Sequence, residues 1–472
     1  MVKNKTAYLF IITLVASLGG FLFGFDMAVV SGILPLIEKQ FVLTSFEKGW
    51  FVSSALVGCI IGVAISGELS DRLGRKKPLI VAAILFLLSA LGCSLLPGLT
   101  GIIAARMVGG IGIGLASNVV PLYISEIAPA RIRGRLVTYY QFAITLGILV
   151  AYLTNSALLH YALAHTGDTT GLMHTVLVTE VWRGMFGIGV IPAVLFALGL
   201  MMVPESPRWL IQHQREQEAT TILNRINNAI EAKASLQQGR QMQKEKRISY
   251  KTLLEPKWRK ALIIGILLPL FSQFSGINAI IYYGPSILSN AGVSLSNSLL
   301  SQIIFGGANM LFTLIAIWKV DSLGRRPLYL AGTVGAFVSL LATGICFYTG
   351  ATTGWALLVC VLAFMASFAF SIGPLKFVVA AEIFPGPIRG RAMAISIMVM
   401  WVADTIVGQL TPILLESIGT AFTFWLFALF CLIAFITVYK LLPETKGKSL
   451  EQIEKDWKEK ADADLYGTPV GH

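Results

Sequence analysis

Two charged residues lie inside long apolar runs in the first half of the chain. Asp26 falls in the run 8–36 and Arg106 in the run 101–125. Because a charge at the centre of a membrane helix costs roughly 2.5–3.5 kcal/mol on insertion scales, such residues usually serve a function. Their opposite signs predict that they interact. The pair is either a structural ion pair or a site where a carboxyl group loads and releases a proton as its surroundings change.

Two further charges stand in apolar runs of the second half. Lys376 follows Gly373 and Pro374, and Asp404 lies in the run 392–415. Either these two charges pair with each other, or Lys376 faces a substrate. The sequence alone does not choose between these alternatives.

Neutral polar and aromatic side chains in the same kind of run mark a candidate ligand cavity. An amide offers two donors and an acceptor, which suits a ligand rich in hydroxyl groups. An aromatic ring can stack on the apolar face of a sugar. The alternative for any single amide is a hydrogen bond between neighbouring helices. The candidate substrate-binding residues are Gln141, Gln273, Asn278, Tyr282, Asn309, Phe377 and Trp401.

Hydropathy predicts the elements that must position these residues. Hydrophobic residues fill 55% of the 472 positions and charged residues only 13%. This composition excludes an ordinary soluble enzyme, a disordered chain and a nucleic-acid scaffold. Only helices and closed barrels span lipid, and the apolar runs are too long for barrel strands, so we expect an all-α membrane protein. The twelve predicted transmembrane helices are 8–36, 50–70, 79–97, 101–125, 137–158, 184–203, 260–288, 298–320, 327–349, 355–384, 392–415 and 420–442.

Basic residues predict the orientation of these helices. The net charge is +12, and Lys and Arg concentrate in alternate loops, such as 72–77 and 131–135. The positive-inside rule therefore places both termini in the cytoplasm and explains the charge without a nucleic-acid partner. We expect the polar stretch 205–259 to be a cytoplasmic linker with short amphipathic helices, and 444–472 to be a cytoplasmic tail.

An internal repeat divides the chain into two similar halves. The motif Asp71–Arg75 recurs as Asp321–Arg325, and Glu126–Arg135 recurs as Glu382–Arg391. A third motif, Pro-Glu-Ser-Pro at 204–207, recurs as Pro-Glu-Thr-Lys at 443–446. Six helices separate the members of each pair, so the six-helix bundles 1–204 and 260–443 are predicted to be parallel repeats. This is a transporter architecture, with substrate bound between the halves.

Enzymatic chemistry has little support in the sequence. The glycine-rich stretch Gly109–Gly114 lies inside an apolar run with no preceding strand, so we interpret it as a helix-packing surface and not a phosphate loop. The five cysteines all fall in apolar runs and form no C-x-x-C pair, which predicts buried thiols. No metal spacing or catalytic triad stands out. We expect a protein that is not an enzyme and that has no cofactor.

Several motifs in order resemble the sugar porter family of the major facilitator superfamily, over about residues 8–455. These motifs are GFDMAVVSG at 24–32, DRLGRK at 71–76, PESPR at 204–208, QFSGIN at 273–278 and PETKG at 443–447. The first resembles the helix 1 motif of bacterial proton-coupled symporters for xylose, arabinose and galactose. The resemblance implies the major facilitator fold and a carrier for monosaccharides that alternates between two open states.

The resemblance also implies roles for individual residues. Asp26 stands where proton symporters of the family carry an acid, and Arg106 matches the arginine that partners it. The amides already named match sugar-contacting positions, and Trp401 matches a tryptophan near the sugar. Six cytoplasmic charges match a gating network that latches the halves together: Arg75, Glu126, Arg133, Arg325, Glu382 and Arg389.

The chain departs from the family pattern around the expected sugar site. Ser272 replaces the first of two successive glutamines, and Phe377 stands at the position of a tryptophan. Met400 replaces a glutamine of the xylose symporter, Asp404 replaces a neutral residue, and Lys376 is unusual beside the Gly-Pro pair. These changes leave hexoses, pentoses, polyols and sugar derivatives open as substrates.

Taken together, the sequence predicts a secondary transporter that imports a monosaccharide by proton symport in a bacterial-type cytoplasmic (inner) membrane. Its expected partners are the sugar, a proton and the lipid bilayer, and we expect a functional monomer because the path lies between halves of one chain. Two alternatives remain: a facilitative uniporter for a sugar or polyol, and a transporter-like sugar receptor that signals through the 205–259 segment.

Overall fold

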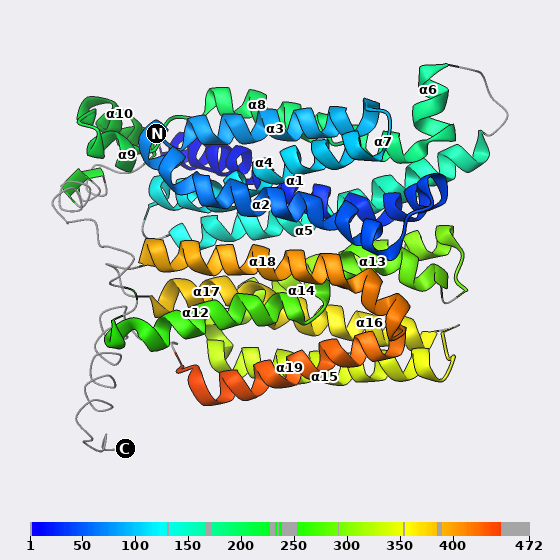
Figure 1. Ribbon diagram of the computed structural model, residues 1–472. Helices are drawn as coiled ribbons and strands as arrows, with labels where there is room; N and C mark the ends of the chain where they lie inside the picture. Colours follow the sequence, from blue (N-terminus) through cyan, green and yellow to red (C-terminus); the bar gives the residue numbers. More distant parts are fainter. Residues whose placement is uncertain are drawn as a thin grey trace. The chain divides into compact units, whose positions relative to one another are not determined.

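The computed structural model describes residues 2–129, 132–165, 171–226, 232–233, 236–237, 253, 255–290, 292–352, 355–384 and 389–444. All regular elements within these ranges are helical (Figure 1). Twelve of the helical segments in this part of the chain are long and apolar enough to cross a membrane. This confirms the predicted count, and we treat the chain as a multi-pass membrane protein.

The helices follow the predicted apolar runs, with some longer than expected. In the first half they are α1 (Val2–Phe41), α2 (Ser45–Leu73), α3 (Lys76–Leu95), α4 (Leu99–Ile127), α5 (Arg133–Ala164), the short α6 (Leu172–His174), α7 (Val181–Gly187), α8 (Val190–Met202), α9 (Pro207–Gln212) and α10 (Glu216–Ile226). In the second half they are α12 (Pro256–Phe274), α13 (Ile277–Asn290), α14 (Leu295–Leu323), α15 (Arg325–Tyr348), α16 (Trp355–Ser367), α17 (Gly373–Ile383), α18 (Arg389–Ser417) and α19 (Thr420–Leu441).

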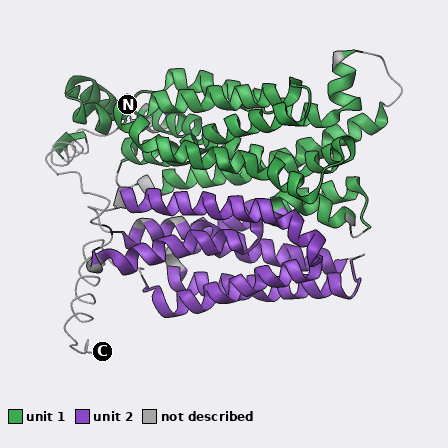
Figure 2. Cartoon of the chain, viewed as in Figure 1, with its two compact units in different colours: residues 1–246, 281–306 green, residues 247–280, 307–472 purple. Residues whose placement is uncertain are grey.

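The chain forms two compact units, coloured separately in Figure 2. The first comprises residues 1–246 with 281–306, and the second comprises 247–280 with 307–472. The later part of α13 and the earlier part of α14 therefore belong to the first unit. Within the first unit α1 packs along α5 and α2 along α4, and within the second α15 packs along α19. The predicted boundaries at 204 and 260 stay a prediction.

Close packing of α2 on α4 depends on the glycine-rich stretch. A Cβ atom placed on Gly110 would lie 1.9 Å from the carbonyl oxygen of Ala55, and one on Gly114 would lie 2.3 Å from that of Cys59. Both contacts are with backbone, which cannot swing aside. The glycines therefore serve helix packing inside α4, as the sequence predicts.

Replacing Gly110 with alanine is expected to destabilise the protein by about 1–3 kcal/mol, because α2 and α4 must separate to admit one methyl group. The measurement is the melting temperature of detergent-purified protein. Gly67→Ala on α2 is the matched control: its Cβ would meet no atom within 4 Å, and alanine favours a helix interior by roughly 0.5–1 kcal/mol. An equal effect of both substitutions would contradict the packing role.

Two of the membrane-spanning segments are interrupted where functional residues were predicted. The α12 helix ends at Phe274 and α13 begins at Ile277, and Gly276 between them has φ of 82°, a conformation suited to glycine. The span 355–384 contains a π-helical turn at Phe368–Ile372 before α17 starts at Gly373. Such irregularities often occur at functional sites.

The segment after α8 contains the short helices α9 and α10. Trp209, Leu210, Ile211 and Ala219 form their shared apolar core. Lys5 Nζ donates to the carbonyl oxygen of Asn224 at 2.7 Å, so the start of α1 contacts α10. The N-terminus accordingly lies beside α9 and α10 within the first unit (Figure 1). Most of the predicted linker beyond 226, and the tail beyond 444, lie outside the described residues.

Candidate functional site

Arg106 lies fully inside the first unit, on α4. Its side chain is 1% exposed, and Nε donates to the carbonyl oxygen of Phe51 at 2.8 Å. The guanidinium carbon lies 5.0 Å from the ring centroid of Phe51 and 5.7 Å from that of Phe186. These aromatic faces stabilise a desolvated cation. Nη1 is buried and has no hydrogen-bond partner among the described residues.

Asp26, on α1, is the opposing charge to this arginine. The two side chains form no ion pair within 4.0 Å in the described structure, and Nη1 of Arg106 and the buried Oδ2 of Asp26 both lack a hydrogen-bond partner there. The predicted interaction of Asp26 with Arg106 stays a prediction, and in the described structure the arginine contacts Phe51 through the carbonyl oxygen and the ring. Sequence reasoning had no signal for Phe51.

A second polar cluster lies in the second unit, at the break between α12 and α13. Nδ2 of Asn278 donates to Oε1 of Gln273 at 2.8 Å and to Oδ1 of Asp404 at 2.7 Å. Gln273 is 4% exposed and Asp404, on α18, is 2% exposed. The predicted amides Gln273 and Asn278 are thus brought together, with a carboxylate as their neighbour.

Lys376, on α17, belongs to the same cluster. Its Nζ donates to Oγ of the fully buried Ser272 at 3.1 Å, and its charge is opposed by Asp404. Lys376 and Asp404 therefore belong to one polar cluster, Lys376 through Ser272 and Asp404 through Asn278. Lys376 is 9% exposed, so little of the ammonium group is left for a ligand.

The remaining predicted sugar contacts belong to both units: Gln141 and Tyr282 to the first, Asn309 and Trp401 to the second. The Tyr282 hydroxyl donates to Sδ of Met27, the residue after Asp26, at 3.3 Å within the first unit. Gln141 on α5 is half-buried and Asn309 on α14 is 6% exposed, and neither amide hydrogen-bonds to another described residue. Trp401 is fully buried on α18. The Phe377 side chain lies outside the described residues.

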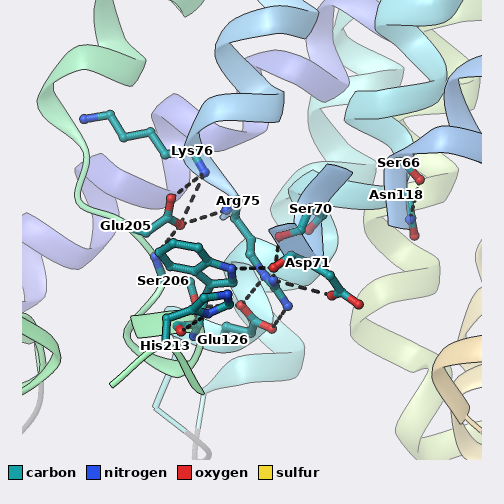
Figure 3. Close-up of polar contacts among 11 residues, drawn as sticks. Ser66, Ser70, Asp71, Arg75, Lys76, Asn118, Glu126, Glu205, Ser206 and His213 are labelled. Atoms are coloured by element: carbon teal, nitrogen blue, oxygen red, sulfur yellow. Dashed lines mark hydrogen bonds and ion pairs between the residues drawn. The ribbon is translucent and has the colours of Figure 1, made fainter. Parts of the chain in front are cut away.

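The first pair of the predicted gating network is present in the first unit (Figure 3). Arg75 donates two hydrogen bonds to Glu126, from Nε to Oε2 at 2.8 Å and from Nη2 to Oε1 at 2.8 Å. The side chains are 6% and 1% exposed, so this is a desolvated bidentate ion pair between the start of α3 and the end of α4. Ser206 Oγ also donates to Glu126.

Glu205 completes this cluster at the N-terminus of α3. Its carboxylate accepts from the backbone N–H of Arg75 at 2.8 Å and of Lys76 at 3.2 Å (Figure 3). These are N–H groups that the helix itself leaves unpaired, and the negative charge suits the helix dipole. The indole of Trp209 donates to the carbonyl of Asp71 at 2.9 Å. The sequence marked 204–207 as a repeated motif and as part of a family motif, but it did not indicate this role.

The second unit repeats the arrangement. Arg325 Nη2 donates to Glu382 Oε1 at 2.7 Å, and Glu444 accepts from the backbone N–H groups of Arg325 and Arg326, each at 3.1 Å. Each carboxylate of the repeated Pro-Glu motif therefore caps the helix that begins at, or directly after, an arginine predicted for the gating network. The Arg133 and Arg389 side chains, also predicted for the network, lie outside the described residues.

Two buried amides were missed by the sequence interpretation. Gln302 on α14 is fully buried, and neither of its amide atoms has a partner within the described ranges. Asn155 on α5 is fully buried and donates to the carbonyl of Val29 on α1 at 3.0 Å. Both lie in apolar runs, as the predicted amides do, so their residue type was the available signal.

Comparison with known proteins identifies relatives along nearly the whole chain. The family model described as "Sugar (and other) transporter" matches residues 12–457. The chain is 40% identical over 456 residues to an arabinose-proton symporter of Bacillus subtilis, covering 96% of each chain. It is 38% identical over 489 residues to the D-xylose-proton symporter of Escherichia coli, covering 96% of this chain and 97% of the relative.

Solved structures resemble the fold to the same extent. The major facilitator superfamily proton:xylose symporter bound to 6-bromo-6-deoxy-D-glucose superposes with a TM-score of 0.80 at 36% sequence identity. The match covers 96% of this chain and 100% of that one.

Proposed function

Because the chain belongs to the sugar porter family of the major facilitator superfamily, we propose that it imports a monosaccharide together with a proton across the cytoplasmic membrane. Two relatives similar along nearly their whole length are named as proton symporters, one for arabinose and one for D-xylose. Coupling of a sugar to a proton is therefore the function that its relatives support best.

One observation carries the proton part of the proposal. The Asp26 carboxyl is held inside α1 with Oδ2 buried and unpartnered, and Arg106 acts on it across space. Buried polar atoms without partners are rare and call for an explanation. A proton added to Oδ2 would break no ion pair, so Asp26 can alternate between a charged state attracted by Arg106 and a neutral state released from it.

The charge balance of the polar cluster in the second unit supports a neutral sugar as the substrate. The one lysine of the polar cluster, Lys376, is opposed by Asp404, so the cluster carries no net charge to attract an anionic ligand. The amides Gln273 and Asn278, with Gln141, Asn309 and Tyr282, supply hydrogen-bonding groups for hydroxyls. Phe377 and Trp401 are proposed to contact the apolar face of the ring.

Transport is proposed to follow alternating access, with sugar bound near the midplane between the repeats. Arg75 with Glu126, and Arg325 with Glu382, are proposed to form the closed cytoplasmic gate together with Arg133 and Arg389. Protonation of Asp26 weakens its attraction to Arg106 and permits the change of state. Both termini are proposed to face the cytoplasm, with one chain as the functional unit.

The test is uptake of labelled D-xylose, L-arabinose, D-glucose and D-galactose into vesicles that contain the purified protein, with and without an inward proton gradient. Symport predicts that at least one sugar accumulates above equilibrium only when the gradient is present. Equilibration that ignores the gradient would show a facilitative uniporter. Binding of a sugar without any movement would show a receptor.

A further inference from the structure

A buried lysine, a buried carboxylate and two amides form a polar cluster in the second unit. Lys376 Nζ donates to Ser272, and Asp404 opposes the lysine charge. Asp404 Oδ1 accepts from Asn278 Nδ2 at 2.7 Å, and the same nitrogen donates to Gln273 Oε1 at 2.8 Å. Three of these residues, Ser272, Lys376 and Asp404, are departures from the family pattern, and the structure places them around the same two amides.

Asp404 dictates the directions of the two hydrogen bonds that Asn278 makes, one to Asp404 and one to Gln273. A carboxylate only accepts, so Asn278 must turn its NH₂ group toward it. That group gives its second hydrogen to Gln273, which must therefore turn its carbonyl oxygen toward Asn278. The Asp404 carboxylate thus fixes the orientation of two side-chain amides, each of which could otherwise exchange the positions of its oxygen and nitrogen.

The two amides consequently keep opposite groups for a ligand. Gln273 retains its Nε2, a donor, and Asn278 retains its Oδ1, an acceptor. Neither atom hydrogen-bonds to another described residue, and neither is among the fully buried polar atoms that lack a partner. Both atoms therefore keep some exposure and can bind a hydroxyl group.

Lys376 is the positive charge that stabilises this orientation of the two amides. Asp404 is 2% exposed, and a carboxylate so deeply buried is strongly disfavoured unless a positive charge compensates it. Lys376, bonded to Ser272 in the same cluster, is the cation that would keep Asp404 ionised and acting only as an acceptor. The short Ser272 side chain accepts a hydrogen bond from the ammonium group at 3.1 Å.

We propose that Lys376 and Asp404 form a specificity-determining pair that fixes Gln273 as a donor and Asn278 as an acceptor toward the sugar. The inference rests on the proposed function of sugar transport. It requires a ligand that accepts a hydrogen bond at one position and donates one at a neighbouring position, which two adjacent hydroxyl groups do. Lys376 and Asp404 are positioning residues, since they act through the amides.

Deoxy and deoxyfluoro analogues of D-glucose and D-xylose report this polarity directly. Fluorine can accept a weak hydrogen bond but cannot donate one. At the hydroxyl bound by Asn278, the fluoro analogue should compete with the labelled parent sugar as poorly as the deoxy analogue, about tenfold or more below the parent. At the hydroxyl bound by Gln273, the fluoro analogue should compete several-fold better than the deoxy analogue.

Asp404→Asn is the decisive variant, because an amide can accept or donate and no longer dictates the direction. We expect the advantage of the fluoro over the deoxy analogue at the hydroxyl bound by Gln273 to disappear, and the fluoro analogue at the hydroxyl bound by Asn278 to compete no worse than the deoxy analogue. Asp404→Glu keeps a carboxylate and should retain the wild-type pattern. The double variant Lys376→Met/Asp404→Asn leaves no uncompensated charge and should behave as Asp404→Asn does. A wild-type analogue pattern in folded Asp404→Asn would overturn the proposal.

Gln273→Glu provides a second test that leaves Lys376 and Asp404 in place. It replaces the donor offered to the ligand with an acceptor, so the fluoro analogue at that position should lose its advantage over the deoxy analogue. Retention of that advantage would also overturn the proposal. Glu416→Gln is the control for the Asp404 variants, since it removes an exposed carboxylate from α18, the helix that also carries Asp404. Failure of the wild-type protein to bind any sugar would instead refute the proposed function itself.

Discussion

Replacing Asp26 with asparagine is expected to abolish accumulation of sugar against a gradient while leaving exchange of sugar across the membrane intact. The side chains have the same size, but asparagine cannot gain or lose a proton, so the sugar can no longer be coupled to proton flow. An inward gradient of one pH unit supplies about 1.4 kcal/mol, enough for roughly tenfold accumulation at one proton per sugar. The variant should equilibrate the sugar and stop there.

The measurement is paired: gradient-driven uptake and counterflow of preloaded labelled sugar in the same vesicles. Glu38→Gln is the matched control, because Glu38 is a carboxylate on the same helix that is 37% exposed and pairs with Lys48. The control should accumulate sugar normally. Normal accumulation by Asp26→Asn would show that the proton binds elsewhere, and loss of counterflow as well would show that Asp26 is needed for more than coupling.

Glu126→Ala is expected to be the most destabilising substitution in the charge cluster, at about 3–5 kcal/mol. The reason is that Arg75, with a side chain only 6% exposed, would lose both bonds of its bidentate partner and remain a buried charge. Ser206 would lose its acceptor as well. The effect should appear as a large fall in the melting temperature of the purified protein.

Glu68→Ala is the control for this prediction. Glu68 pairs with Arg72 one turn before Arg75, but the two side chains are 69% and 75% exposed. Exposed pairs contribute only about 0–1 kcal/mol, so the melting temperature should barely change. Equal losses from the two substitutions would mean that the Arg75–Glu126 pair is hydrated and contributes little to stability.

The apolar runs predicted the membrane-spanning helices well because lipid leaves the backbone no alternative structure. The repeated motifs were also informative, since Arg75 and Glu126, and again Arg325 and Glu382, meet as pairs within their own units. The break between α12 and α13 falls at Gly276, inside the QFSGIN motif at 273–278 that the sequence analysis singled out. These features depend on local sequence or on matching repeats.

Features that depend on tertiary packing were not accessible from the sequence. The opposite signs of Asp26 and Arg106 predicted that they interact but could not show that Phe51 on α2 binds the guanidinium. The sequence left two roles open for Lys376, and it could not show that Lys376 on α17 and Asp404 on α18 bond to Ser272 and Asn278 at the break between α12 and α13. The orphan amide of Gln302 has no sequence signature beyond its residue type.

The two capping carboxylates, Glu205 and Glu444, are synthesised long after the helix N-termini that they cap. Arg75 leaves the ribosome 130 residues ahead of Glu205, the residue that caps its helix, and Arg325 leaves 119 residues ahead of Glu444. In each repeat the cap arrives only after the sixth span has been made. In each half of the nascent chain, the N-terminus of α3 or α15 therefore lacks its capping carboxylate until the sixth span has been synthesised. The cap can form only when all six spans of that half are present.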